Sequence, residues 1–362
     1  MNRKTASTTE ALAAYFKNLP GYCEPYGNGH INDTYLVIAD KKYILQRMNT
    51  SVFPDPAGLM ENISGVTEHI RHKSEKMGKD AARSTLTVIP TLSGECFFKD
   101  KNGDCFRMYD YVTRTVTKER VENPEDFYAC ARAFGYFQQM LSDYPAEKLS
   151  EPIADFHNTP KRFENLMKAV AADPCGRLAR VREEVEFARA REDFCRTLQE
   201  AEKSGRLPLR VTHNDTKLNN ILFDETTGEP VCVIDLDTVM PGYSVNDFGD
   251  SIRFGANTAA EDEVDLSRVS LDLNLFAMYA EGFIEGCGGS LTPAEVDLLP
   301  IGAIMMTLEC GMRFLSDYLV GDTYFKIHRE HHNLDRARNQ FALVADMERK
   351  LPRMREIIRD LL

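Results

Sequence analysis

A short polar segment carries side chains whose types and spacing suit the handling of phosphate groups. His213, Asp215, Lys217 and Asn220 follow the pattern H-x-D-x-x-x-x-N of a kinase catalytic loop. Phosphoryl transfer requires mainly positioning and charge neutralisation, because its transition state is loose and its charge lies on the phosphoryl oxygens. Asp215 can accept the proton of an attacking hydroxyl, and Lys217 can neutralise the transferred group. We expect His213 to hold the loop by hydrogen bonds.

The residues after this loop predict a β-hairpin that returns a second acid to it. Two apolar runs, Ile221–Phe223 and Val231–Ile234, are separated by a turn-rich stretch, and the second strand ends on Asp235. An amide oxygen from Asn220 and a carboxylate from Asp235 suit Mg²⁺, a hard cation that takes few protein oxygens besides phosphate oxygens. Asp237 is a possible second ligand. The alternative is an ordinary polar turn before a hairpin, since Asn and Asp are common turn residues.

A second kinase-like motif occurs at a position that does not suit a metal ligand. Asp247-Phe248-Gly249 matches the metal-binding D-F-G of protein kinases but lies well beyond the hairpin. We therefore assign the metal to Asp235. Asp247 and Asp250 are expected to accept hydrogen bonds from backbone amides of the active-site loops.

Length and composition fit a globular enzyme. The 362 residues include 43% hydrophobic and 28% charged residues, and they suffice for two lobes around a cleft. The net charge of −12 argues against nucleic-acid and anionic-membrane partners, which require a basic surface. Nine scattered cysteines without a C-x-x-C pair fit free thiols in a reducing cytoplasm. No run approaches a membrane-spanning length, no signal peptide is recognisable, and no obligate protein partner is indicated.

The patterns change near residue 113. Before it, β-rich runs at 21–48, 84–89, 95–98 and 105–112 surround one amphipathic helix, 56–76, which indicates a small antiparallel sheet with one helix. After it the pattern is helical, beginning at Asn123-Pro124. Further helices are expected over 160–171, 178–203, 268–286, 293–320 and 335–361. The prediction is an α+β protein with a nucleotide-binding lobe, 1–113, and a mostly helical catalytic and substrate-binding lobe, 114–362.

The sheet lobe is expected to bind nucleotide. The turn Gly27-Asn28-Gly29 can let backbone amides approach phosphates closely, although such a turn is also common in plain hairpins. Tyr109, Asp110 and Tyr111 end a strand that can lead to the hinge between lobes, where backbone groups would meet an adenine edge. An ordinary core strand explains the same run equally well.

Several blocks of the chain resemble the aminoglycoside-phosphotransferase and choline-kinase-like superfamily, which has the protein-kinase-like fold, and within it the N-acetylhexosamine 1-kinases. The resemblance rests on blocks that span nearly the whole chain: 24–37, 43–55, 156–164, 209–222, 234–242, 247–256 and 309–325.

This resemblance implies ATP- and Mg²⁺-dependent phosphorylation of the anomeric hydroxyl of N-acetylglucosamine or N-acetylgalactosamine. Asp215 would contact the sugar O1 and act as the base. A neutral sugar needs several hydrogen-bonding side chains in its pocket, and the candidates are His30, Asn32, Arg253, Glu309, Arg313, Asp317 and Tyr318. Glu309, Arg313 and Asp317 are four residues apart and share one helical face. That row could equally be an internally paired, solvated stripe, and Arg253 could simply pair with Asp250 or Asp247.

One position departs from the kinase pattern. In Y-I-L-Q, Gln46 stands where kinases carry the lysine that binds the α- and β-phosphates. A neutral side chain cannot pair with a helix glutamate such as Glu61 or Glu68, and Arg47 should point to the opposite face of the strand. Two alternatives to the sugar kinase therefore remain. One is a related kinase of another small alcohol, such as an aminoglycoside, choline or homoserine, and the other is a nucleotide-binding pseudokinase.

Overall fold

The computed structural model describes residues 3–27, 31–118, 121 and 123–362. The chain divides into two compact units. Unit 1 contains residues 1–118, 143–154 and 220–241, and unit 2 contains 119–142, 155–219 and 242–362. The hairpin with Asn220 and Asp235 thus belongs to unit 1, whereas the sequence prediction put every residue after 113 in one C-terminal lobe.

Unit 1 is built on an antiparallel sheet with the order β1-β2-β3-β6-β4, and β5 also pairs with β6. The strands are β1 Tyr22–Pro25, β2 Asp33–Ile38, β3 Lys42–Met48, β4 Val88–Ile89, β5 Phe98–Lys99 and β6 Cys105–Asp110. In β6 five successive residues are buried, so this strand forms the centre of the unit. The predicted β-rich runs therefore form one sheet.

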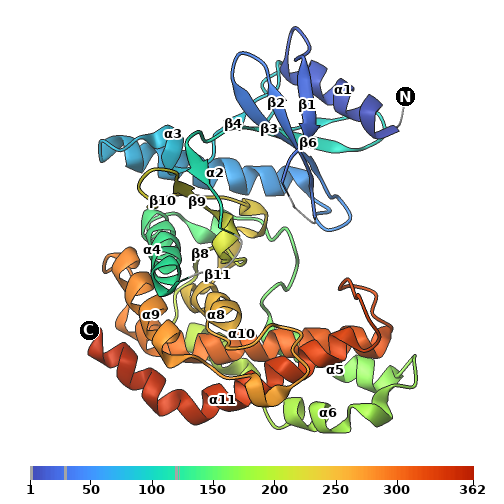
Figure 1. Ribbon diagram of the computed structural model, residues 1–362, viewed down its shortest axis with the longest axis vertical. Coiled ribbons are helices and arrows are strands. Elements are labelled where there is room, and N and C mark those ends of the chain that lie inside the picture. Colours follow the sequence, from blue (N-terminus) through green and yellow to red (C-terminus); the bar gives the residue numbers. More distant parts are fainter. Residues whose placement is uncertain (1–2, 28–30, 119–120, 122) are drawn as a thin grey trace. The chain divides into compact units, whose positions relative to one another are not determined.

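An N-terminal helix that the sequence prediction missed covers one side of this sheet. Helix α1, Arg3–Tyr15, lies beside the strands (Figure 1). It packs Leu12 and Tyr15 into a cluster with Leu45 and Phe106. The Tyr15 hydroxyl donates a hydrogen bond of 2.9 Å to the Phe106 carbonyl. This helix is amphipathic only weakly, and its apolar side is recognisable only once the sheet is present to receive it.

The predicted helix of the first lobe has the expected bounds. Helix α2, Pro56–Lys76, begins after Asp55, whose carboxylate accepts a hydrogen bond from the Gly58 amide. Its predicted face, Leu59, Ile63, Val66 and Ile70, is buried. A short helix, α3 Ala81–Ser84, follows.

The predicted hairpin is confirmed and completes unit 1. Strands β9 Ile221–Asp224 and β10 Pro230–Val233 pair antiparallel, and β9 also pairs with β7 Thr115–Val116. A single 3₁₀ turn, η5 Leu236–Thr238, and strand β11 Met240–Gly242 follow. Turn η1, Ala146–Lys148, lies in the middle segment of the unit.

Unit 2 is mostly helical, as predicted. Its elements are α4 Pro124–Met140, α5 Thr159–Ala172, η2 Leu178–Arg180, α6 Arg182–Arg189, η3 Phe194–Arg196, α7 Thr197–Lys203, β8 Arg210–Thr212, η4 Leu218–Asn220, α8 Ser244–Gly255, η6 Leu266–Arg268, α9 Leu273–Cys287, α10 Pro293–Val320 and α11 His332–Asp360.

In unit 2 one helix prediction was wrong and one helix was missed. The expected helix over 178–203 is divided into two short helices and two 3₁₀ turns, because Arg191 at the break turns towards α11 and forms a two-point ion pair with Glu348. Helix α8 was missed because its sequence contains two glycines and several polar residues. The helix forms because it is buried against α10. A Cβ on Gly249 would lie 2.3 Å from the Gly302 carbonyl, so the backbones of α8 and α10 are in close contact at this glycine.

Helix α10 is the central helix of unit 2. It has the length and hydropathy of a membrane span, contrary to the expectation that no run approaches this length, but 94% of its apolar window is buried inside the protein. Thr292 and Glu295 form a capping box at its start. We therefore interpret α10 as a buried core helix.

Candidate active site

The predicted catalytic loop lies in unit 2, directly after β8. His213 is fully buried, and its ring packs against the rings of Phe134 and Phe137 with centroid distances of 5.3 and 5.8 Å. Its Nδ1 accepts a hydrogen bond of 3.3 Å from the Asp215 amide. His213 is therefore a positioning residue, as the sequence analysis expected.

Asp247 anchors the backbone of this loop. Its carboxylate accepts hydrogen bonds from the His213 amide at 2.9 Å, the Asn214 amide at 2.7 Å and the Gln138 side chain at 2.7 Å. The Thr216 hydroxyl donates to the Asp247 carbonyl at 2.7 Å. Asn214 adopts a left-handed conformation with φ of 64°. The D-F-G spelling thus marks a loop anchor, which confirms the expected structural role of Asp247.

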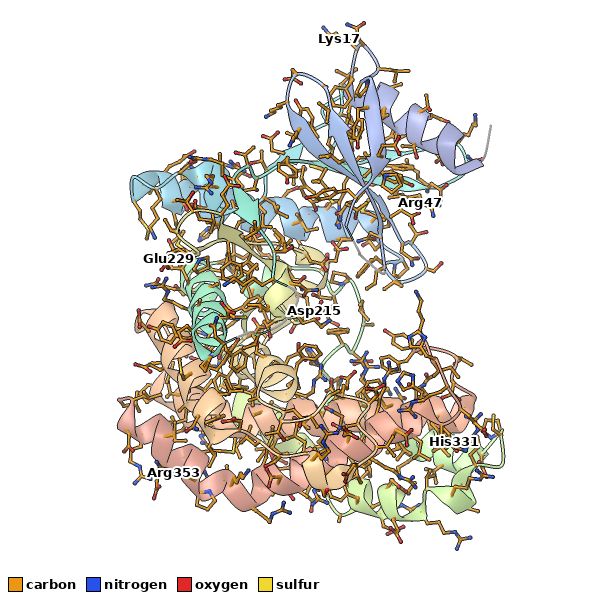
Figure 2. The ribbon with its side chains drawn as sticks, in the orientation of Figure 1. Lys17, Arg47, Asp215, Glu229, His331 and Arg353 are labelled. Atoms are coloured by element: carbon orange, nitrogen blue, oxygen red, sulfur yellow. The ribbon has the colours of Figure 1, made fainter. Side chains whose placement is uncertain are left out.

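Asp215 and Lys217 are the partly exposed members of the loop. Lys217 Nζ lies 2.5 Å from Asp215 Oδ1, and the two side chains are 38% and 28% exposed. Asp215 is labelled in Figure 2. Burial works against the charged form of Lys217, but the carboxylates of Asp215 and Asp250 outweigh it and raise the pKa of Lys217. Lys217 therefore carries its positive charge beside a carboxylate that can receive a proton.

Arg253, one of the predicted sugar contacts, has structural partners instead. Its Nη2 lies 3.0 Å from Asp250 and its Nη1 lies 2.6 Å from Glu261, and the residue is buried. Burial raises the pKa of the Asp250 carboxyl, but the charges of Arg253, Lys217 and His157 together lower it below the usual value. Asp250 therefore pairs with charged side chains, whereas the sequence analysis had expected it to accept hydrogen bonds from backbone amides.

Glu309 is buried and forms a small polar cluster with the start of α5. Its carboxylate lies 2.8 Å from His157 Nδ1 and accepts a hydrogen bond of 2.7 Å from the Thr159 hydroxyl. Burial opposes ionisation, but His157 and Arg313 hold the pKa of Glu309 below its usual value. His157 was not among the predicted site residues, although it lies within the block 156–164 that carried the family resemblance.

The other members of the predicted stripe on α10 differ in role. Arg313 is half-buried, and its guanidinium lies 5.5 Å from the ring centroids of Phe156 and Phe325. Asp317 instead accepts hydrogen bonds from three backbone amides of the turn at 323–325 and from Asn333. Tyr318 is fully buried and bonds His331 at 3.1 Å (Figure 2). Asp317 and Tyr318 therefore stabilise the end of α10, which corrects their prediction as sugar contacts.

In unit 1 the hairpin brings the two principal candidate metal ligands together. The Ile234 amide donates a hydrogen bond of 2.9 Å to the Asn220 carbonyl, so Asp235 lies next to the residue that precedes β9. Asp235 is exposed and adopts a left-handed conformation with φ of 58°, which is unfavourable for a residue with a side chain. Among the described residues no group of three or more His, Cys, Asp and Glu could hold a metal. One carboxylate and one amide fit Mg²⁺ when phosphate oxygens supply other ligands.

Asp237 is not placed like a metal ligand. Its side chain is 5% exposed, Oδ1 lies 2.5 Å from the Arg107 guanidinium, and Oδ2 accepts a hydrogen bond of 2.6 Å from Asn32. Burial disfavours the charged form of Arg107, but Asp237 outweighs this and raises the pKa of the guanidinium. Asn32, predicted to contact sugar, is thus bound to Asp237. Arg107 was missed by sequence reasoning, because a buried cation inside a strand leaves no local pattern.

Part of the predicted nucleotide site is also revised. Gly27 has a φ of 76°, which only glycine adopts easily, whereas Asn28, Gly29 and His30 lie outside the described residues. The Asp110 amide donates to the Thr87 carbonyl at 3.0 Å and the Tyr111 amide to Lys42 at 3.3 Å, so these donors are already used within the sheet. The Tyr109 side chain is buried. The sequence analysis expected backbone groups of residues 109–111 to meet an adenine edge, and of these groups the amides of Asp110 and Tyr111 are already bonded within the sheet.

Solved structures of small-molecule kinases share this fold. A microcompartment-associated aminopropanol kinase is 17% identical over 97% of this chain and 98% of its own, with a TM-score of 0.63. An amicoumacin kinase solved with AMP-PNP and Ca²⁺ is 14% identical over 99% and 94%, with a TM-score of 0.56. A choline/ethanolamine kinase family protein from Mesorhizobium loti is 19% identical over 98% and 99%, also with a TM-score of 0.56. These matches confirm the predicted α+β kinase-like fold.

The sequence itself matches a family model. That model, APH, describes a phosphotransferase enzyme family and matches residues 23–280, which include the catalytic loop, the hairpin and Asp247. The chain therefore belongs to the APH phosphotransferase enzyme family.

Proposed function

We propose that the protein transfers the γ-phosphoryl group of Mg-ATP to the anomeric hydroxyl of an N-acetylhexosamine, giving the sugar 1-phosphate. The observation that carries the phosphotransferase part is the catalytic loop: a partly exposed Asp215 beside Lys217, on a backbone that the buried Asp247 anchors. The sugar part rests on the resemblance of blocks such as 24–37, 43–55, 156–164 and 309–325 to N-acetylhexosamine 1-kinases.

Each residue has a defined task in this reaction. Asp215 orients the anomeric hydroxyl and accepts its proton as the bond from O1 to the γ-phosphorus forms and the bond from that phosphorus to the bridging oxygen of ADP breaks. Lys217 neutralises charge on the phosphoryl group. Asn220 and Asp235 would hold Mg²⁺, which neutralises the charge of the bound nucleotide phosphates. Support for the nucleotide comes from the amicoumacin kinase, which was solved with an ATP analogue and a divalent cation.

Ion pairing within unit 2 favours a neutral acceptor over a cationic one. A choline-like or aminoglycoside-like substrate is best bound by carboxylates that have no cation of their own. Asp250 is paired with Arg253, and Glu309 is bound to His157 and Thr159. Arg313, half-buried between aromatic rings, adds a hydrogen-bond donor that suits sugar hydroxyl and acetamido oxygens.

The second candidate is a kinase of the same family that acts on another small alcohol. It is favoured by the fold matches to an aminopropanol kinase and to a choline/ethanolamine kinase family protein. The two candidates predict different acceptors, so one assay separates them.

The test is phosphate transfer from Mg-ATP to a panel of N-acetylglucosamine, N-acetylgalactosamine, glucose, galactose, choline, homoserine and kanamycin, with the product position read by phosphorus NMR. An anomeric phosphate on the N-acetylated sugars supports the proposal. Transfer only to another acceptor overturns the sugar assignment and retains the kinase. Nucleotide binding without any transfer supports a pseudokinase.

The role of Asp215 is tested on the same product. Asp215→Asn should lower kcat about a thousandfold, because a positioned base contributes roughly 10²–10⁴ to such rates. Asp193→Asn is the matched control, since this carboxylate also lies in unit 2 and is fully exposed. If Asp215→Asn retains activity within about tenfold of wild type, a barrier change of only about 1.4 kcal/mol, Asp215 is not the base.

A further inference from the structure

The pair of charges that kinases place between a strand and a helix is missing from its usual position. In protein kinases a strand lysine pairs with a helix glutamate and binds the phosphates. Here the strand residue is Gln46, and the acids Glu61 and Glu68 on α2 are exposed. Unit 1 therefore needs another way to fix the residues that face the nucleotide.

A buried cation occurs one strand away from Gln46. Arg107 on β6 is the register partner of Gln46 on β3, and its side chain is 1% exposed. Arg107 Nε donates a hydrogen bond of 3.0 Å to Gln46 Oε1, and Gln46 Nε2 donates one of 3.1 Å to the Thr34 hydroxyl. The amide of Gln46 thus orients a guanidinium group.

The guanidinium is directed at the loop that follows β10. Arg107 Nη1 lies 2.5 Å from Asp237 Oδ1, and Asn32 donates to Asp237 Oδ2 at 2.6 Å. Asn32 is itself fixed, because its Oδ1 accepts a hydrogen bond of 3.0 Å from the Asn49 amide. Asp237 is consequently held from β6 and from the start of β2.

Asp237 lies two residues after the exposed candidate metal ligand Asp235. On the other side of Asp237, the buried Asn62 of α2 donates a hydrogen bond of 2.9 Å to the Val239 carbonyl. The loop between these contacts must keep Asp235 in its left-handed conformation, which persists only where neighbours enforce it. The Arg107–Asp237 pair is the restraint among these that involves two charged side chains.

We propose that Arg107 is a positioning residue for the metal site: paired with Asp237, it fixes the loop so that Asp235 presents its carboxylate to Mg²⁺. This inference rests on the proposed function, because it presumes that the protein binds Mg-ATP. Arg107 therefore forms a buried ion pair within unit 1, but from β6 and with a loop aspartate instead of a helix glutamate.

Burial distinguishes this role from direct contact with phosphates. A guanidinium that is 1% exposed and already bound to a carboxylate and an amide has no surface for a nucleotide. Buried ion pairs often add little net stability compared with apolar residues of the same size, and their best-supported use is to specify one geometry. The geometry specified here is that of the loop with Asp235.

The experiment measures Mg²⁺ binding, nucleotide binding and folding, without relying on activity. Arg107→Met, Arg107→Lys and Asp237→Asn are compared with wild type by calorimetric titration of Mg²⁺ into the protein with ATP, by titration of ATP in EDTA, and by thermal unfolding. We expect Mg²⁺ affinity to fall about tenfold to a hundredfold in Arg107→Met and Asp237→Asn, the usual effect of removing a partner of a metal-ligating group. ATP affinity in EDTA should stay within about twofold of wild type. The Arg107→Met/Asp237→Asn double variant should lose no more Mg²⁺ affinity than either single variant, because all three break one pair.

Arg47→Met is the matched control. Arg47 is the neighbour of Gln46 on β3 and was predicted to point to the opposite face of the strand. It pairs with Asp33 and Asp104. It should keep wild-type Mg²⁺ affinity.

Two results overturn the proposal. The first is unchanged Mg²⁺ affinity in folded Asp237→Asn and Arg107→Lys, which also decide the question if Arg107→Met does not fold. The second is an equal loss of ATP affinity in EDTA, which would mean that Arg107 contacts phosphates. If no acceptor is phosphorylated in the transfer assay, the proposed function is refuted, but the effect of Arg107 on Mg²⁺ binding can still be measured.

Discussion

Replacing Glu295 by glutamine should destabilise the protein and change how its stability depends on pH. Glu295 is completely buried at the start of α10, and both its oxygens are used. Oε1 accepts from Arg210 Nε at 2.6 Å and from the Ser244 hydroxyl at 2.8 Å, while Oε2 accepts from Arg210 Nη2 at 2.7 Å and from the Thr292 amide at 2.8 Å. This carboxylate therefore joins α10 to α8 and to β8, the strand that leads into the catalytic loop.

The magnitude follows from this geometry. Glutamine has one acceptor oxygen, so in either orientation its NH₂ group faces an Arg210 N–H and a second donor. The Arg210 side chain is 12% exposed and would keep a charge without a counterion. Removing one partner of a buried ion pair costs roughly 3–5 kcal/mol. We expect Glu295→Gln to lower the free energy of unfolding by about 3 kcal/mol at pH 7.

The pH dependence has a definite sign. Burial opposes ionisation of Glu295, but Arg210, the Thr292 amide and Ser244 hold its pKa below the usual 4.5. A carboxyl whose pKa is lowered by folding stabilises the protein above its unfolded pKa, and that stability is lost as pH falls through the folded pKa. Glutamine does not titrate, so the difference between wild type and variant should be largest at pH 5–7 and should shrink below about pH 4.5.

The assay is urea unfolding followed by far-ultraviolet circular dichroism at several pH values between 4 and 7. Asp297→Asn is the control, since Asp297 lies two residues away on the same helix and is exposed. A difference below about 0.5 kcal/mol at pH 7, or one that grows towards acid pH, would refute the reasoning, because it would mean that the ion pair contributes little or that Glu295 is already protonated.

Three further predictions use other parts of the molecule. Asp235→Asn should raise the Mg²⁺ concentration required for half-maximal activity by about tenfold or more, and an unchanged Mg²⁺ profile would move the metal to another residue. Gly135→Ala should cost about 2 kcal/mol of stability, because the added Cβ would lie 2.3 Å from the Phe283 carbonyl of α9; an unaltered melting temperature would show that α4 and α9 separate easily. Asp143 has its pKa lowered to about 2, first by the hydrogen bond from Lys73. Asp143→Asn should therefore remove a stabilisation that the wild type has above about pH 4 and loses in acid. Because the side chain is 62% exposed, we expect the loss to be less than about 1 kcal/mol. A larger loss in urea unfolding at pH 7 would contradict the expectation that solvent weakens this ion pair.

Much of the site was predictable because its signals are local. The order and spacing of His213, Asp215, Lys217 and Asn220 can be read within eight residues, and the hairpin after them follows from two apolar runs and a turn. The bounds of α2 and α10 were predicted correctly because an apolar repeat of helical period and a capping residue at each start are local as well.

Other predictions failed because polar residues in one stretch of sequence have several possible partners. Asp317 could have faced a substrate, but it binds the amides of a turn six to eight residues later. Arg253 could have bound sugar, but Glu261 comes within 2.6 Å of it. Residue type indicates that a charge needs a partner, but the packing of helices decides which partner it has.

The sequence by itself determined the fold class and the family and predicted a kinase-type catalytic loop, because these depend on residue type, short spacing and periodicity. Tertiary structure alone decided how the loop and the hairpin are held. Asp247 accepts a hydrogen bond from the His213 amide, and Arg107, the register partner of Gln46, forms an ion pair with Asp237. Asp247 lies 34 positions from His213 and Arg107 lies 130 positions from Asp237. Contacts at such separations depend on strand register and helix packing, which leave no periodic pattern along the chain.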